Sequence, residues 1–263
     1  LVLIIILAIF INLFLKSLPE QKIQELKAEK LIEITEPFSA NLYFNDEFGK
    51  NILSNLVIES INEAQKSLDI AIYSMNDERI RDAVYRAADR GVNVRLVFSD
   101  VHSDIINRLF AEKRDNIEKR DLASRDKKNQ KPEYMHHKFI IIDKAEATQK
   151  LLFGSYNFTY IQDRYDPSFI FETNRSEIID VYGFEFERIF SGISGREKLK
   201  ASEYKTFAVN IKYPEGFLEI WFGPQSGDRG IKTRMLELIK KSKNNIKAMI
   251  WIMTDRDIAE GLL

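Results

Sequence analysis

Apolar residues in the first part of the chain recur at helical spacing in some segments and in short continuous runs in others. Residues 51–67 carry apolar side chains three and four apart, which predicts a helix. These are Ile52, Leu53, Leu56, Val57 and Ile61. A strand is expected before this helix at 40–45, and further strands after it at 68–75 and 92–100. Between the last two we expect a helix in which Asp77 is the N-cap and Gly91 ends the helix.

This order of strand, helix, strand, helix and strand predicts an α/β sandwich with a largely parallel central sheet. The segment Glu112–Glu133 then holds eight Lys or Arg and six Asp or Glu. We interpret it as a solvated loop, although its basic end could steer a polyanion or a lipid headgroup. Two strands, KFIIID and LLFGSYNF, are expected to follow, and after them a short strand, PSFIFET. An amphipathic helix over 176–192 is expected to end this part of the chain.

The order of predicted strands and helices begins again near the C-terminus. Ala40–Val84 aligns with Leu218–Leu262 at a constant offset of 178 without gaps, and eight of the 45 positions are identical. The two segments also share the order strand, helix, strand, helix. We interpret this as an internal duplication whose second copy is cut off at Leu263.

The first fifteen residues are apolar apart from Asn12, which predicts a transmembrane anchor or signal segment over 1–15. A buried core helix is the alternative interpretation. No A-x-A-like cleavage site follows, so we favour an uncleaved anchor that holds the rest of the protein outside the cytoplasm. Residues 16–36 are expected to form a charged, mostly helical spacer. A main domain over 37–200 and the start of its repeat over 205–263 complete the expected organisation.

The composition limits the kinds of binding site and metal site that the chain can form. The net charge is −1, so any binding of nucleic acid or anionic lipid must come from a local patch. The chain has no cysteine, which excludes disulfides and thiolate metal sites.

The stretch YMHHKFIIID, from Tyr134 to Asp143, is the clearest chemical signal. In a strand, alternate side chains share a face, so His136 and Lys138 point one way and His137 points the other. We expect His137 to be packed and hydrogen-bonded. In GSYNF, Ser155 and Asn157 likewise share a face. If the two strands are neighbours, an imidazole, an ammonium, a hydroxyl and an amide converge, and this set suits a phosphate group.

The pattern His136-x-Lys138-x4-Asp143, followed by Gly154-Ser155-x-Asn157, resembles the HKD motif of the phospholipase D superfamily. The resemblance implies an α-β-α sandwich half-domain, followed here by the truncated start of a second copy. It also implies a phosphodiesterase that needs no metal and no cofactor. In such a site one HKD histidine attacks phosphorus and forms a phosphohistidine, and a second protonates the leaving alcohol and then activates water.

The same resemblance implies a role for each matching residue. His136 is the nucleophile or its partner acid, and Lys138 and Asn157 hold the phosphoryl oxygens. Ser155 helps the phosphate contacts, and Asp143 orients the site. We therefore expect His136, Lys138 and Asp143 as the catalytic set.

One position departs from the family pattern. Family members often carry a glutamate that orients the motif histidine, and Ser168 stands at that place here. Asp166 or Glu172 could substitute as the orienter. If neither does, His136 loses its orienting partner and activity is expected to be low.

The mechanism needs two HKD histidines, and this chain contains one motif. The offset predicts a second motif at about position 314, in a missing C-terminal half. A homodimer that pairs two His136 residues is the alternative. The expected substrates are phospholipid or nucleic-acid diesters, and the N-terminal segment is expected to provide the contact with a membrane. A member that acts only as an endonuclease and a catalytically weak binding or scaffold module remain as alternatives.

Overall fold

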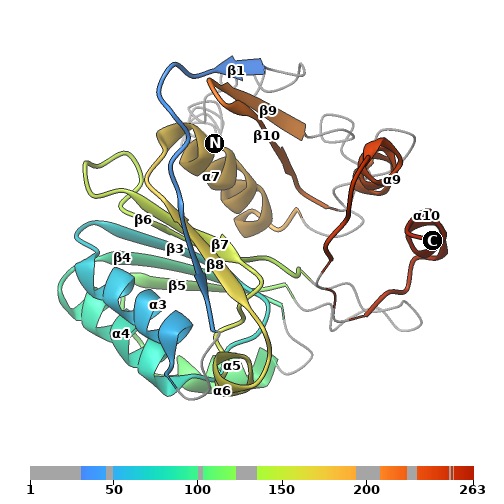
Figure 1. Ribbon diagram of the computed structural model, residues 1–263. Helices are drawn as coiled ribbons and strands as arrows, with labels where there is room; N and C mark the ends of the chain where they lie inside the picture. Colours follow the sequence, from blue (N-terminus) through green and yellow to red (C-terminus); the bar gives the residue numbers. More distant parts are fainter. Residues whose placement is uncertain are drawn as a thin grey trace, which may run out of the picture. The chain divides into compact units, whose positions relative to one another are not determined.

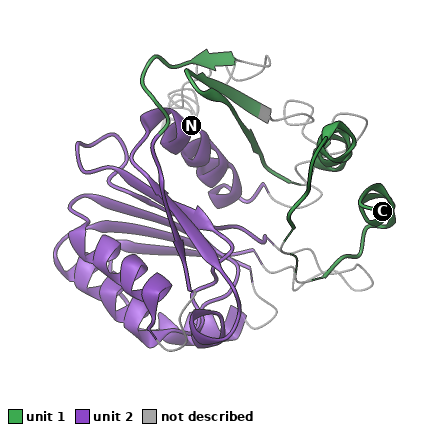
Figure 2. Cartoon of the chain, viewed as in Figure 1, with its two compact units in different colours: residues 1–38, 198–263 green, residues 39–197 purple. Residues whose placement is uncertain are grey.

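The computed structural model of the chain describes residues 31–45, 50–99, 103–122, 135–193, 208–223, 230–248, 250 and 252–263 (Figure 1). The chain forms two compact units (Figure 2). One is the continuous segment Ser39–Glu197, and the other combines Leu1–Phe38 with Lys198–Leu263.

A seven-stranded sheet forms the centre of the Ser39–Glu197 unit, in the order β2-β8-β7-β6-β3-β4-β5. The strands are β2 (Asn41–Phe44), β3 (Ser67–Ile72), β4 (Asn93–Phe98), β5 (Ile117–Asp121), β6 (Lys138–Ile142), β7 (Lys150–Gly154) and β8 (Phe169–Thr173). Only β3, β4 and β5 pair in parallel, and every other pair in this sheet is antiparallel. The prediction of a largely parallel sheet was therefore wrong. The connection between β6 and β7, residues 143–149, is too short for a crossover and therefore favours an antiparallel pair.

Helices cover both faces of this sheet, as the α-β-α sandwich prediction requires (Figure 1). Helix α3 (Ile52–Glu63) and helix α4 (Glu78–Asp89) lie together on one face, and α7 (Ser176–Phe190) lies on the other. Two shorter helices are α5 (Ser103–Leu109) and α6 (Tyr160–Arg164). The α/β fold class is confirmed.

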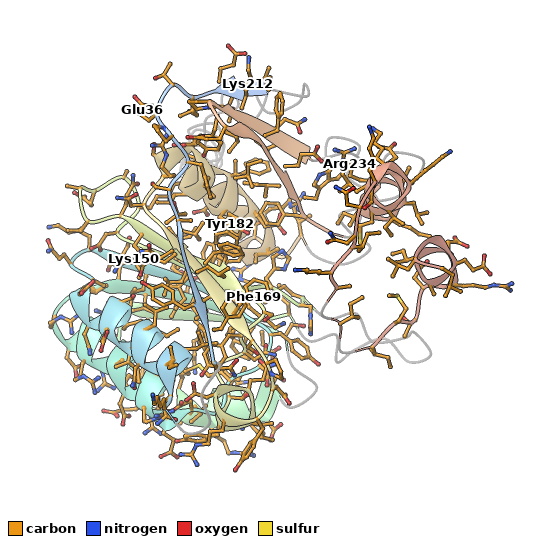
Figure 3. The ribbon with its side chains drawn as sticks, in the orientation of Figure 1. Glu36, Lys150, Phe169, Tyr182, Lys212 and Arg234 are labelled. Atoms are coloured by element: carbon orange, nitrogen blue, oxygen red, sulfur yellow. The ribbon has the colours of Figure 1, made fainter. Side chains whose placement is uncertain are left out.

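Strand β6 shows how the two faces are filled. Ile140 and Ile142 belong to the cluster of buried side chains that α3 and α4 cover. Phe139 points to the other face, where its ring lies 5.1 Å from that of Tyr182 on α7. Tyr182 is labelled in Figure 3. Because successive side chains of a strand point to opposite faces, β6 is an apolar strand buried on both sides.

The ends of α4 agree with the sequence analysis. The carboxylate of Asp77 accepts a hydrogen bond from the backbone N–H of Arg79 at 2.9 Å, as an N-cap does. Gly91 follows the helix with φ 91°, a conformation that glycine adopts without steric cost.

Strand β5 was missed, because its segment reads as a charged loop. It pairs in parallel with β4 at the edge of the sheet. The sequence IEKRD has no apolar alternation, since an edge strand can expose charged side chains to water. The basic stretch at 125–131 lies outside the described residues.

Among its described residues, the second unit contains a small sheet of order β1-β9-β10 and two helices. The strands are β1 (Leu31–Glu33), β9 (Ala208–Tyr213) and β10 (Gly216–Trp221), and the helices are α9 (Ile231–Lys241) and α10 (Arg256–Gly261). Strand β1 pairs in parallel with β9. The spacer expected over 16–36 therefore has a strand, not a helix, at its described end, because β9 offers backbone partners there.

The duplication can be compared with these elements. At the offset of 178, the first residue of α10, Arg256, falls on the first residue of α4, Glu78. Asp255 caps α10 through the N–H of Ile258, just as Asp77 caps α4. Helix α9 begins at Ile231, one residue from the position that aligns with the start of α3. The helix positions agree with the repeat, but the described residues 245–248, which align with β3, form no strand, and the repeat stays a prediction.

Residues 1–15, the expected anchor or signal segment, lie outside the described residues. Within the parts of the chain that are described, no helix combines the length and the apolar character needed to cross a membrane.

Candidate active site

Four of the predicted site residues, His136, Lys138, Ser155 and Asn157, lie along the edge of the seven-stranded sheet that the ends of its central strands form. At this edge β3 and β7 end while β6 and β8 begin. His136 and Lys138 enter β6 here, and Ser155 and Asn157 leave β7. A bridge between Met75 and Phe158 holds the segment after β7 against the segment after β3. Strand pairing therefore brings together residues that lie far apart in the sequence.

His136 and Lys138 are in direct contact. The Lys138 ammonium lies 3.2 Å from Nδ1 of His136 and donates to the backbone carbonyl of His136 at 3.0 Å. The ring of Tyr73, the first residue after β3, lies 4.5 Å from the His136 ring and 5.3 Å from Lys138 Nζ. Three side chains thus form one cluster, with the His136 side chain exposed to solvent.

The surroundings lower the pKa of both basic groups. The His136 ring loses part of its surrounding water where it packs against Tyr73. This loss, followed by the positive charge of Lys138 and the neighbouring His137, lowers the pKa of His136 to about 4. Burial lowers the pKa of Lys138 to about 7. At neutral pH His136 is therefore an uncharged imidazole, the form that can attack an electrophile.

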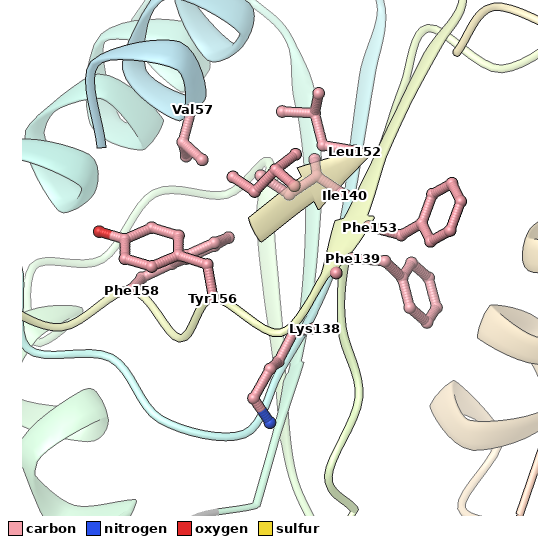
Figure 4. Close-up of a pocket in the computed structure, with 10 residues that line it drawn as sticks. Val57, Lys138, Phe139, Ile140, Leu152, Phe153, Tyr156 and Phe158 are labelled. Atoms are coloured by element: carbon pink, nitrogen blue, oxygen red, sulfur yellow. The ribbon is translucent and has the colours of Figure 1, made fainter. Parts of the chain in front are cut away.

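A small apolar pocket explains the burial of Lys138. Its side chain lines this pocket together with Val57, Ile140 and Leu152. The ammonium group points away from these apolar side chains (Figure 4). The methylene stem is buried while the charged end reaches the sheet edge, an arrangement common for lysine.

Asn157 is oriented by the backbone. It is 8% exposed, and its Oδ1 accepts a hydrogen bond from the N–H of Ser74 at 3.3 Å. Because Oδ1 is engaged in this way, Nδ2 is the part of the amide that can donate to a ligand. Ser74 directly follows Tyr73, so Asn157 is tied to the segment that contacts His136.

Ser155 and Gly154 join β7 to β8. The hydroxyl of Ser155 accepts from the N–H of Phe169 at 3.1 Å, and the Ser155 N–H donates to the carbonyl of Phe169 at 3.1 Å. A Cβ at Gly154 would lie 2.1 Å from that carbonyl oxygen. Glycine is thus required for the close approach of the strands, and Ser155 holds them together while keeping its own proton to donate.

Asp143 does not reach this edge. It follows β6 at the opposite end, roughly 17 Å along the strand from Lys138. Its fully buried carboxylate accepts from the backbone N–H groups of Gln65, Lys66 and Ser67 and from the hydroxyl of Thr148. The expectation that Asp143 is catalytic is therefore not supported by its position, since it fixes the turn between α3 and β3.

Neither candidate orienter contacts His136. The carboxylate of Glu172 accepts from Asn41 at 3.1 Å and lies 3.8 Å from the ammonium of Lys150. Lys150 and Phe169 mark opposite ends of the β7–β8 pair in Figure 3, and Glu172 lies towards the Lys150 end. The Asp166 side chain is exposed, and the Asp166 backbone carbonyl accepts from Asn45. The described contacts therefore give no support to Asp166 or Glu172 as the orienter of His136.

His137 is packed on the other face of the sheet, as expected. Its Nε2 lies 2.8 Å from Oε1 of Glu185 on α7, a carboxylate with no solvent exposure. Glu185 also pairs with Arg188. His137 thereby attaches the start of β6 to α7, and this confirms its separation from the site residues.

Sequence reasoning missed two residues that matter here, Tyr73 and Glu185. Tyr73 lies in the run LDIAIYSM and reads as part of a strand, although the strand ends one residue earlier. A tyrosine placed where a strand meets the site edge is the signal that was available. Within the described residues, no three His, Asp or Glu side chains converge as a metal-binding group.

The fold and these contacts define a class of protein: an α/β sandwich with a histidine and a lysine side by side at one edge of its sheet. The family model described as "Cardiolipin synthase, PLD-like domain" matches residues 57–190, just over half of the chain. The chain therefore belongs to the phospholipase D superfamily, in this PLD-like family.

Two curated relatives have similar sequences. A mitochondrial cardiolipin hydrolase from Homo sapiens is 30% identical over 144 residues, which cover 54% of this chain and 52% of that protein. A phospholipase D from Rickettsia bellii is 28% identical over 130 residues, covering 49% and 59%. The chain thus spans about half the length of the curated relatives it matches.

Two solved structures are also similar to this chain, at lower sequence identity. Nuc from Salmonella typhimurium, a phospholipase D family member, is 20% identical with a TM-score of 0.47, over 58% of this chain and 94% of that chain. NucT from Helicobacter pylori is 22% identical with a TM-score of 0.48, over 58% and 96%.

Proposed function

We propose that this chain supplies one histidine of a phosphodiester hydrolase that works through a phosphohistidine and without a metal ion. The observation that carries the proposal is the contact between His136 and Lys138 at the sheet edge. The lone pair of the neutral His136 imidazole forms a bond to phosphorus as the bond from phosphorus to the leaving alcohol breaks. A second HKD histidine gives its proton to that alcohol.

The second half of the reaction reverses these roles. The second histidine takes a proton from water, the water oxygen bonds to phosphorus, and the bond to His136 breaks to release a phosphomonoester. Lys138 and the Nδ2 group of Asn157 stabilise the negative charge that develops on the phosphoryl oxygens. We propose that the second histidine comes from the second copy of the repeat, with a homodimer as the alternative.

We propose a phospholipid as the substrate. Both curated relatives have names that refer to lipid diesters, cardiolipin hydrolase and phospholipase D. The apolar run at 1–15 would hold the site near a bilayer, with the domain outside the cytoplasm. Extraction of membranes with alkaline carbonate tests the anchor, because an anchored protein stays in the pellet.

The test of the proposed function uses the full-length protein with EDTA present throughout. Vesicles of phosphatidylcholine and of cardiolipin are compared with single-stranded DNA. Release of phosphatidic acid, together with an acid-labile and alkali-stable phosphoprotein, is the expected result. Cleavage of DNA alone would favour a nuclease. Binding without turnover of any diester would favour a scaffold.

The pKa of Lys138 leads to a prediction about pH. Lys138 loses its charge as the pH rises through about 7, so kcat/KM for a synthetic phosphate diester is expected to fall above that pH. Arginine stays protonated, so the Lys138→Arg variant is expected to lose activity only at a higher pH. Lys113, whose side chain is 88% exposed, provides the matched control Lys113→Arg. Identical pH profiles for Lys138→Arg and the unmodified protein would contradict this assignment.

A further inference from the structure

An aromatic ring, that of Tyr73, contacts the His136 side chain. The resemblance to the family predicts a carboxylate in that role. Ser168 stands at the expected place, and Asp166 and Glu172 are directed elsewhere. The contacts recorded for the His136 side chain come from Tyr73 and Lys138. An imidazole whose ring must face phosphorus needs a fixed orientation, and these two residues are placed to provide it.

Tyr73 is itself held firmly. Its backbone N–H donates to the carbonyl of His137 at 3.0 Å, which continues the pairing of β3 with β6 by one residue. The next residue, Ser74, donates to the side chain of Asn157. The Tyr73 side chain is half-buried, so its ring is held in place beside His136.

The geometry of the contact suits an orienting role. The rings of Tyr73 and His136 are 4.5 Å apart at an angle of 53°, within the range of attractive aromatic pairs. Lys138 Nζ lies 5.3 Å from the centre of the same tyrosine ring, close enough for a cation–π interaction. One ring therefore contacts both groups that are proposed to act on phosphate.

We propose that Tyr73 is a positioning residue that orients His136 through its aromatic face, in the place of an orienting carboxylate. The inference rests on the proposed function, because it assigns Tyr73 a part in that reaction. A carboxylate would add a full negative charge beside the imidazole and favour its protonated form. A tyrosine ring orients the imidazole without that charge, and His136 stays neutral at physiological pH.

Three variants of the full-length protein test this assignment. Tyr73→Leu removes the ring but keeps apolar volume, Tyr73→Phe keeps the ring, and Tyr85→Leu removes a half-buried tyrosine of α4 as the matched control. We expect Tyr73→Leu to lower kcat about tenfold or more with KM changed less than about threefold. Tyr73→Phe is expected to retain at least about a third of kcat. Tyr85→Leu loses the hydrogen bonds of Tyr85 to Leu109 and Glu112 but is expected to keep the kcat and KM of the unmodified protein.

A second measurement reads the orientation of His136 without turnover. In an NMR titration, Tyr73→Leu should remove the ring-current shift of the His136 ring protons. It should also raise the pKa of His136 towards its ordinary value of 6.5, because water regains access to the ring. Lys138 and His137 are the charged or titratable neighbours that influence this pKa. Tyr73→Phe should leave both signals in place.

The outcomes separate the two proposals. If no diester is turned over, the proposed function fails, while the NMR titration still decides whether Tyr73 orients His136. If turnover occurs and Tyr73→Leu matches the unmodified protein in kcat and in the titration, the role of Tyr73 is overturned. Equal loss of kcat in Tyr73→Phe and Tyr73→Leu would also overturn it, because the hydroxyl would then be the group that matters.

Discussion

Replacement of His136 by alanine is expected to lower kcat for any phosphate diester by about 10³-fold or more. The side chain is exposed, so its removal leaves no cavity and no buried group without a partner. The loss should therefore appear in turnover while the stability is unchanged. Steady-state kinetics of the full-length protein, combined with thermal unfolding, measures both quantities.

His137→Gln provides the contrast within the same pair of histidines. His137 contacts buried Glu185 and not the site, so this change should lower the free energy of unfolding by about 1–3 kcal/mol and leave kcat within a few-fold. The assignment of His136 would be refuted if His136→Ala retained full activity. It would also be refuted if His137→Gln lost kcat as strongly as His136→Ala.

Replacement of Asp143 by alanine is expected to lower the free energy of unfolding by about 3–5 kcal/mol. The change removes the buried carboxylate that accepts hydrogen bonds from three backbone N–H groups and from the Thr148 hydroxyl. Asp143 also has φ 49°, a left-handed conformation that Asp and Asn tolerate better than Ala. Chemical denaturation measures the loss, and folded Asp143→Ala should keep a kcat within a few-fold of the unmodified protein.

The matched control for Asp143 is asparagine, which keeps one acceptor and tolerates the same backbone conformation. Asp143→Asn should therefore cost less stability than Asp143→Ala. The assignment of a structural role fails if kcat falls a hundredfold in either variant while its stability is retained. Such a result would return Asp143 to the catalytic set.

The stabilisation by Asp143 should depend on pH in a defined direction. Burial raises the pKa of its carboxyl, but the hydrogen bonds from Ser67, Lys66 and Gln65 outweigh burial and lower the pKa overall. A carboxyl with a lowered folded-state pKa stabilises the protein above its unfolded pKa of about 4. That stabilisation is lost as the pH falls through the folded-state pKa, and Asp143→Ala should lack this part of the acid sensitivity.

The sequence predicted those parts of the fold whose signal is local. Helix α4 has a cap, a stop and an apolar stripe within fifteen residues, and the structure confirms it. The direction of β6, β7 and β8 depends on which strands become neighbours in space, and periodicity within one strand does not carry that information. Strand β5 escaped prediction because its partner, β4, supplies the pairing that its own charged residues do not indicate.

For the candidate site too, the sequence predicted what depends on local geometry and not what depends on strand pairing. Alternation along β6 correctly separated His136 from His137, because the two-residue period of a strand is a geometric rule. Because His136 and Asp143 are part of one motif, we expected both in the catalytic set. The five-residue strand β6 lies between them, so they stand at opposite ends of that strand. Tyr73 contacts His136 through the pairing of β3 with β6, and that contact spans 63 positions of sequence.

The partner of strand β1 decides how the chain should be divided for expression. Because β1 pairs with β9, the Ser39–Glu197 unit is an insertion between two pieces of the other unit. A fragment that begins before Leu31 and stops at Glu197 would keep β1 without β9, and an unpaired strand with an exposed Leu31 favours aggregation. A fragment that begins at Ser39, one residue before the start of the aligned repeat at Ala40, avoids this edge.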